Sequence, residues 1–188
     1  MTEPNWIRNY KELISGIEIC LSKGLLLPVL VLIFTAIDTV GWLASEDQNQ
    51  GVGKRFRAWV DKWMLQKYPL PCTAEELYQE RCAILHTLTP GSRLTKEKGV
   101  RRIAYAWGDA KLKDLEESIK LTKYPMLVAV HVDDIFLSFR NGFADFLEML
   151  ESHPASKKIF IQKANKHFAN MDKDIVSEFL ASAKKGKT

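Results

Sequence analysis

The side chains best suited to chemistry lie together in the heptapeptide Glu80–His86, which reads Glu-Arg-Cys-Ala-Ile-Leu-His. Arg81 carries a permanent positive charge on a planar fork that fits a phosphate group. His86 titrates near neutral pH, so its imidazole can accept and release a proton. Phosphate binding and proton transfer are the two functions that cleavage of RNA without a metal ion requires. The heptapeptide therefore predicts a phosphodiester-cleaving site with Arg81 and His86 as its catalytic residues.

We expect the heptapeptide to lie at the end of a helix that runs from Thr73 to Leu88. Thr73 is a good N-cap, Glu76 completes a capping box three residues later, and the helical pattern stops before Pro90-Gly91. Five residues along an α-helix turn through about 140°, so Arg81 and His86 of one chain would point in different directions. Either the helix ends between them, or two chains combine to form the site.

Size, charge and cysteine content indicate a single globular domain over residues 1–188 with a basic tail at 184–188. A chain of this length buries roughly 70% of its unfolded surface. A net charge of +4 is compatible with nucleic acid or an acidic partner. Three cysteines without disulfide spacing and an N-terminus without a signal pattern predict a cytoplasmic protein. The apolar run Leu25–Ile37 is too short to span a bilayer, which predicts a core helix and no membrane association.

Helical periodicity dominates the rest of the chain. Besides the helix of the heptapeptide, the expected helices are Trp6–Leu21, Leu27–Leu43, Lys54–Gln66, Leu112–Leu121, Pro125–Leu150 and Ser156–Ala183. Residues 87–124 form an insert in which Val100–Trp107 alternates as a strand does. Gly142 interrupts the long helix and allows close packing or a bend there. We therefore expect a mainly α fold, a single antiparallel helical bundle with a small β-hairpin or extended insert between the heptapeptide's helix and the long helix.

The Arg-x4-His pattern of Arg81 and His86, on a helix of an all-α chain, resembles the HEPN superfamily. The resemblance covers Trp6 to Leu150 as a helical plan, and as sequence only the heptapeptide. It implies a metal-independent endoribonuclease of the toxin or defence kind that needs no cofactor. It also implies a homodimer in which two copies of the motif share a cleft. Family members commonly carry a polar Asn, Asp or His where this chain has Cys82, so a degenerate relative that only binds RNA or a partner stays open.

In the expected mechanism, His86 deprotonates the ribose 2′-hydroxyl or protonates the leaving oxygen. Arg81 stabilises the charge that develops on the phosphorane-like transition state. An acid and a base are both needed, so both copies of the motif in a dimer would take part.

Several side chains could support this pair. The candidates are Cys82, Glu80, Asp133, Asp134 and, beyond these, Asp38. An aspartate within about 4 Å of Arg81 or His86 would hold the charged form of its partner. In the alternative interpretation, Arg81 pairs with Glu80 or Glu76, and His86 is only a cation at a helix C-terminus. A nucleophilic Cys82–His86 pair is also possible at this spacing, although no third group completes it.

Cations alternate with aromatic residues in the insert, a pattern that single-stranded RNA could use for stacking and phosphate contact. The predicted RNA-binding residues are Arg101, Arg102, Tyr105 and Trp107. The same alternation is also typical of an ordinary amphipathic strand, so both interpretations stay open.

Two alternatives do not involve RNA cleavage. His131 with Asp133 and Asp134 could bind a metal ion, but no second ligand set with suitable spacing accompanies them, so we expect no metal. In the other, the chain is a non-enzymatic helical interaction module. Its long helix, Pro125–Leu150, would then form a dimer or a groove for another protein such as an antitoxin.

Overall fold

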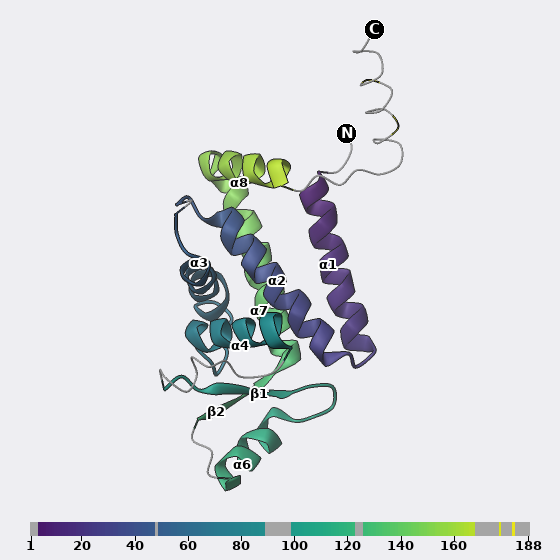
Figure 1. The fold of residues 1–188 in the computed structure, drawn as a ribbon, viewed down its shortest axis with the longest axis vertical. Helices are drawn as coiled ribbons and strands as arrows, with labels where there is room; N and C mark the ends of the chain where they lie inside the picture. The colour runs from purple at the N-terminus through teal and green to yellow at the C-terminus, as the bar shows by residue number, and fades with distance from the viewer. Residues whose placement is uncertain are drawn as a thin grey trace.

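The computed structural model describes residues 4–47, 49–88, 99–122 and 126–167, together with residues 177 and 182. Its described part is mainly helical and contains a parallel sheet of two strands, β1 and β2 (Figure 1). The helices are α1 (Asn5–Ser22), α2 (Leu26–Ala44), α3 (Val52–Trp59), the π-helix η1 (Val60–Leu65), α4 (Ala74–Thr87), α6 (Leu112–Thr122), α7 (Val132–Ser152) and α8 (Pro154–His167). The sheet and α6 lie at one end of the molecule and α8 lies at the other (Figure 1).

α2 lies at the centre of the helical layer and packs against α1, α3, α4, α7 and α8. Its sequence is apolar on nearly all sides, as expected for a helix with neighbours around it. Fully buried residues such as Ile33, Phe34 and Ile37 form the middle of the core. By length and composition alone α2 could cross a membrane, with a mean hydropathy of 2.1, but half of that window is buried inside the fold. The packing partners support the predicted role as a core helix.

The predicted third helix is present, but it changes type halfway. α3 continues directly into η1, whose wider turns cover Val60–Leu65. α7 crosses η1 so closely that a Cβ atom on Gly142 would overlap the carbonyl oxygen of Trp63. The expectation that Gly142 permits close packing is therefore confirmed.

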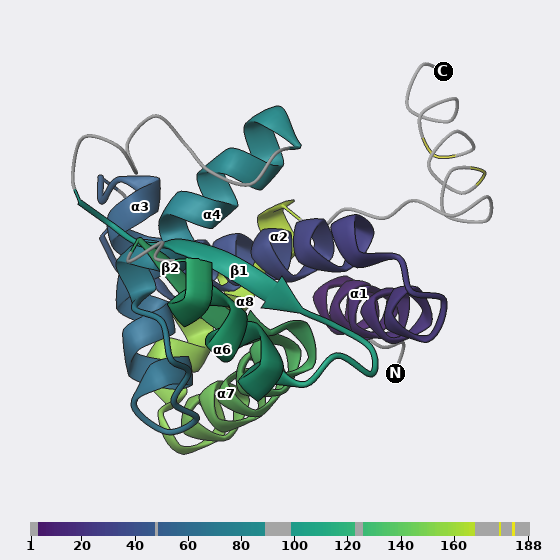
Figure 2. The same ribbon diagram turned by 90° about the horizontal axis from the view of Figure 1, so that it is seen from below.

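The expected β-hairpin is wrong. β1 (Arg102–Ala106) and β2 (Leu127–His131) are parallel, with Ile103 opposite Val128 and Tyr105 opposite Val130. A tight turn cannot join parallel strands, and α6 supplies the crossover between them (Figure 2).

The start of the long helix is also corrected. β2 occupies residues that were predicted to be its first turns, so α7 begins at Val132 rather than at Pro125, which itself lies outside the described residues. Val128, Ala129 and Val130 are all buried. A short buried apolar run of this kind fits a strand as well as a helix, and its β-branched residues favour the strand.

The ends of the remaining predictions are partly outside the described residues. α8 begins two residues before the predicted Ser156 and is described to His167, so half of the predicted stretch to Ala183 and all of the basic tail at 184–188 are not covered. Residues 89–98, 123 and 124 of the predicted insert are likewise outside. Its described part contains β1 and α6, and the sheet it forms extends past residue 124 into β2.

Candidate functional site

Capping residues fix where α4 begins. The Thr73 side-chain oxygen accepts a hydrogen bond from the Glu76 amide at 3.2 Å, and the Glu76 carboxylate accepts one from the Thr73 amide at 2.8 Å. The predicted capping box is therefore confirmed. At the other end, Leu88 adopts a left-handed conformation with φ 54°. The helix thus continues through His86, and the idea that it ends between Arg81 and His86 is wrong.

The guanidinium of Arg81 is held by a carboxylate from the core helix. Its Nε lies 2.6 Å from Oδ2 of Asp38, and Nη2 contacts the same oxygen. The two side chains are only 14% and 18% exposed, so little water screens their attraction. This contact meets the 4 Å limit set for a supporting aspartate. Asp38 thereby orients Arg81 and partly balances its charge.

Burial favours the neutral forms of Asp38 and Arg81, whereas their pairing favours the charged forms, so the two influences shift each pKa in opposite directions. Burial alone would lower the pKa of Arg81, but the hydrogen bond and the charge of Asp38 outweigh it and raise that pKa. Burial raises the pKa of Asp38 above 3.8, and the charges of Arg81, Arg55 and His86 only partly offset it. The short Nε–Oδ2 distance is typical of a charge-assisted bond, so we describe the two groups as an ion pair.

Arg81 and His86 meet within one chain. Nη1 of Arg81 lies 3.5 Å from Nε2 of His86, and the imidazole is exposed. The two positions lie about 140° apart around the helix, but the arginine side chain is long enough to reach across that angle. Nε2 accepts a hydrogen bond from this donor when the ring proton is on Nδ1. The permanent cation and the titratable ring therefore lie side by side at the exposed end of α4.

Cys82 and Tyr78 extend the same face of α4. The sulfur of Cys82 lies 3.9 Å from Nη1 of Arg81. Burial raises the pKa of Tyr78, and a side-chain hydrogen bond with Cys82 raises it further. The Arg57 guanidinium lies over the Tyr78 ring, 4.9 Å from its centroid. Cys82 therefore links Arg81 to Tyr78.

The two buried glutamates of α4 bind elsewhere. Glu76 holds Arg101 with both oxygens, at 2.6 Å to Nε and 3.1 Å to Nη2. Glu80 is 1% exposed, and its Oε1 accepts a hydrogen bond from the Ile103 amide at 3.2 Å. Neither contact is the pairing with Arg81 that the alternative interpretation required. Both carboxylates instead attach α4 to the start of β1.

The residues at the start of α7 are used for capping. His131 Nδ1 accepts a hydrogen bond from the Asp133 amide at 3.2 Å, and Asp133 Oδ2 lies 3.8 Å from the same nitrogen. Asp134 is exposed in the first turn of α7. Asp38 therefore occupies the position beside Arg81 for which Asp133 and Asp134 had been alternatives. Within the described ranges, three or more metal-ligating side chains nowhere gather into a cluster.

The four predicted RNA-binding residues do not form one surface. Arg101 is bound to Glu76, and the hydroxyl of Tyr105 is buried, which raises its pKa well above 10. Arg102 is exposed, and Trp107 is 45% exposed just after β1. Side chains alternate between the faces of a strand, so Arg102 lies on the opposite face from Tyr105.

Sequence reasoning missed Tyr78 and Arg57 and gave Asp38 only as one of three aspartates. Each had a signal in the sequence. Tyr78 precedes Arg81 by three residues and therefore shares its helix face. Asp38 is the one carboxylate inside the apolar stretch of α2, where a charge needs a partner.

Comparison of the chain with models of known families, with curated proteins and with solved structures found no match. The likeness to the HEPN superfamily thus depends on the heptapeptide and its helix alone.

Proposed function

We propose that this chain is a metal-independent endoribonuclease of the HEPN kind that acts as a cytoplasmic homodimer. The observation that carries the proposal is the 3.5 Å contact between Nη1 of Arg81 and Nε2 of His86 at the exposed end of α4. Exposure leaves the imidazole open to a phosphodiester, and the guanidinium beside it can bind that phosphate's oxygens. The site needs no metal because proton transfer and charge stabilisation are both supplied by side chains.

Asp38 prepares Arg81 for this role. It engages Nε and Nη2, which leaves the Nη1 donors directed toward His86. A guanidinium that is already oriented loses less freedom when the transition state forms, so more of its electrostatic attraction lowers the barrier. Asp38 is a positioning residue in this scheme, since it acts on RNA only through Arg81.

The chemical step is an attack within the RNA. The ribose 2′-oxygen forms a bond to the adjacent phosphorus and gives its proton to one imidazole, while the bond from phosphorus to the 5′-oxygen breaks. A second imidazole, which is protonated before the step, donates its proton to that leaving oxygen. The products are a 2′,3′-cyclic phosphate and a free 5′-hydroxyl. The heptapeptide contributes one histidine, so the second is His86 of another copy, which is why the proposal includes a dimer.

The test is RNA cleavage in EDTA by the wild type, by His86→Ala and by a matched control, His153→Ala. His153 is also exposed, and its ring bonds the Met149 carbonyl at the end of α7. We expect His86→Ala to lose about 10²–10⁴-fold in rate and His153→Ala to keep its activity. The wild-type product should carry a 2′,3′-cyclic phosphate. Equal cleavage by the wild type and His86→Ala would remove His86 from the mechanism.

A second candidate, a non-enzymatic interaction module, is favoured by an apolar groove of about 430 Å³ between the α1–α2 turn, the end of β1 and α7. Leu25, Trp107 and Leu137 line it and are 40–48% exposed. Exposed apolar surface of this kind is typical of a protein contact, for example with an antitoxin. Under this alternative the wild type does not cleave RNA, and Leu137→Glu abolishes association with the partner while His86→Ala does not.

A further inference from the structure

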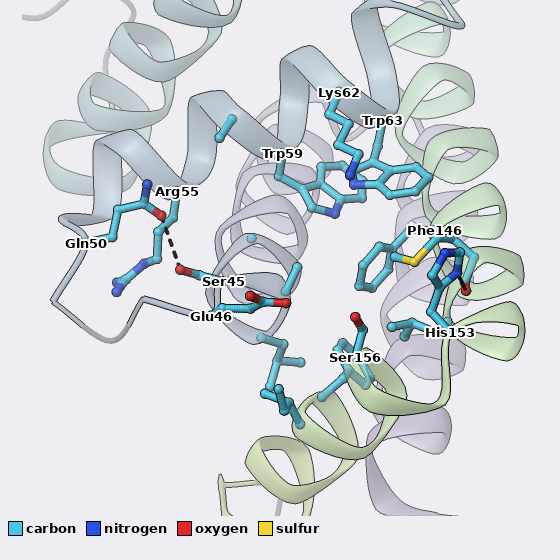
Figure 3. Close-up of a pocket in the computed structure, with 18 residues that line it drawn as sticks. Ser45, Glu46, Gln50, Arg55, Trp59, Lys62, Trp63, Phe146, His153 and Ser156 are labelled. Carbon is cyan, nitrogen blue, oxygen red and sulfur yellow. Dashed lines mark hydrogen bonds between the residues drawn. The ribbon is translucent and has the colours of Figure 1, made fainter.

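A second cavity, separate from the Arg81–His86 contact, lies between the end of α2, the α3–η1 helix and the α7–α8 corner. Its volume is about 370 Å³, within the range of small-molecule sites. Trp59, Trp63 and Phe146 form one wall, Arg55 lies at one end, and Ser156 and His153 lie near the other (Figure 3). The cavity is therefore lined by aromatic rings with polar groups at its ends.

Two buried donors in this cavity lack an acceptor. Trp59 is only 3% exposed, and its indole nitrogen lies on the ring edge that faces the hollow (Figure 3). Within the described part of the chain, neither this nitrogen nor Nε of Arg55 has a hydrogen-bond partner. A buried donor left unsatisfied is costly. Both groups can only donate, so the missing partner is an acceptor.

The aromatic rings favour a flat apolar ligand body. Phe146 packs edge-on against Trp63 at 5.4 Å and against Phe160 at 5.6 Å between centroids, so the wall is continuous. Such rings present their faces and edges to a ligand ring in the offset or edge-to-face arrangements that aromatic pairs prefer.

Charge at the cavity favours an anion. Arg55 and Lys62 line it against one carboxylate, Glu46. The Lys62 ammonium lies 4.9 Å from the centroid of the Trp63 ring. Nearby, Lys163 donates to the carbonyls of Trp42 and Ser45, and burial followed by the charge of Arg55 lowers its pKa. Arg55 and Lys163 thus repel each other, and a bound anion would relieve that repulsion.

We propose that this cavity binds a small organic anion with a flat aromatic body, whose carboxylate accepts a hydrogen bond from Nε1 of Trp59 and is attracted by the positive charges of Arg55 and Lys62. The aromatic body lies against Trp63 and Phe146. The binding site does not depend on ribonuclease activity, because none of its residues belongs to the Asp38–Arg81–His86 group.

The first test uses naphthalene-2-carboxylate as the probe and the indole N–H signals of the five tryptophans as the readout. The Trp59 signal is identified by its loss in Trp59→Phe. In a two-dimensional ¹H–¹⁵N titration of the full chain, we expect the Trp59 signal to move downfield as its hydrogen bond forms. The signals of Trp6 and Trp107, which do not line the cavity, should stay in place. An unmoved Trp59 signal at millimolar probe, or an equal shift of all five signals, overturns the proposal.

The second test separates charge from shape. Arg55→Gln should weaken binding of the carboxylate about tenfold, because one of the positive charges that attract it is lost. The neutral probe naphthalene-2-carboxamide should bind the wild type more weakly than the carboxylate and should respond little to Arg55→Gln. Arg57→Gln is the matched control, since Arg57 lies on the same helix but faces Tyr78 and Glu75. Equal carboxylate affinity in wild type and Arg55→Gln overturns the proposal even if Trp59→Phe does not fold.

Discussion

Arg81 of α4 donates to Asp38 of α2 across 43 residues of chain, and both side chains are largely buried. This contact joins the helix that carries the heptapeptide to the central helix of the core. It also decides which edge of the guanidinium faces His86. A single ion pair therefore influences both the stability of the fold and the geometry of the candidate site.

A double-mutant cycle on Asp38→Asn and Arg81→Gln should reveal strong coupling. Each single change leaves a buried group without its partner and should lower the free energy of unfolding by about 3–5 kcal/mol. The double variant should lose clearly less than the sum of the two. Urea denaturation measures all four proteins. The exposed pair Lys67–Asp145, at 2.8 Å, is the control and should show much weaker coupling, and additive effects at Asp38 and Arg81 would contradict the ion pair.

His86→Ala should separate activity from stability. The imidazole is exposed, so its loss should change the free energy of unfolding by no more than about 0.5 kcal/mol, while RNA cleavage falls. Arg81→Gln should lower both. Thermal unfolding and cleavage assays on the same preparations provide the comparison. A large drop in stability for His86→Ala would mean that the ring has a structural role.

Arg101 and Arg102, neighbours in sequence, should behave differently. Arg101→Gln leaves the buried Glu76 carboxylate without its cation and should lower the free energy of unfolding by about 1–3 kcal/mol. Arg102→Gln should lower the free energy of unfolding less than Arg101→Gln does. Because Arg102 is exposed, the same change should weaken single-stranded RNA binding more than Arg101→Gln does. Thermal unfolding and filter binding measure the two effects. The reverse ranking would show that Arg101 contacts RNA rather than serving the fold.

Gly142→Ala should be strongly destabilising although alanine favours helices. The new methyl group would overlap the Trp63 carbonyl, and such overpacking costs typically about 1–3 kcal/mol. Gly16→Ala is the matched control, because Gly16 also lies inside a helix and the nearest atom to its Cβ position, Cδ1 of Leu32, is at 3.6 Å, an ordinary contact distance. Urea denaturation of both variants tests the close approach of α7 to η1. Equal stability of the two variants would show that the helices can separate without cost.

Stability should fall between pH 9 and pH 12 because of Cys72. Burial raises the pKa of its thiol from 9.0 to about 12, with the Glu76 charge adding to the effect. Below pH 9 the thiol is protonated in both the folded and the unfolded chain, so its contribution to the free energy of unfolding does not change with pH. As pH rises toward 12, only the unfolded chain releases the proton, which favours unfolding.

The cysteine effect is isolated by comparing the wild type with Cys72→Ala at pH 8 and pH 10.5. The difference in unfolding free energy between the two proteins should shift by about 2 kcal/mol against the wild type, as expected for 1.5 pH units. A difference that stays constant would place the thiol in contact with water.

The parts of the fold that sequence predicts well are those fixed by local chemistry. The capping box at Thr73 and Glu76 depends on residues three apart, and the apolar surface of α2 is evident along its length. The Leu127–His131 segment was misassigned because a buried strand and a buried helix have the same apolar composition over five residues. Strand pairing between β1 and β2 depends on contacts across the sheet, which no local pattern contains.

In the candidate site, too, local sequence predicts some features and long-range packing decides the others. Arg81 and His86 were found from their types and spacing, and a supporting aspartate was expected. Which aspartate provides that support depends on how α2 packs on α4, and only the structure gives this. The unsatisfied Trp59 donor could not be predicted at all, because a tryptophan at core spacing has the same sequence signal whether or not its nitrogen finds an acceptor.

Glu76 and Glu80 are one turn apart on α4, and both bind the segment that begins β1, while Asp38 holds Arg81 from the core helix. Rolling of α4 about its own axis would break all of these contacts together. A motion of α4 that changes the access to His86 would therefore carry α2 and β1 along with it. Access to the imidazole would then be controlled by a second molecule that docks against these three elements.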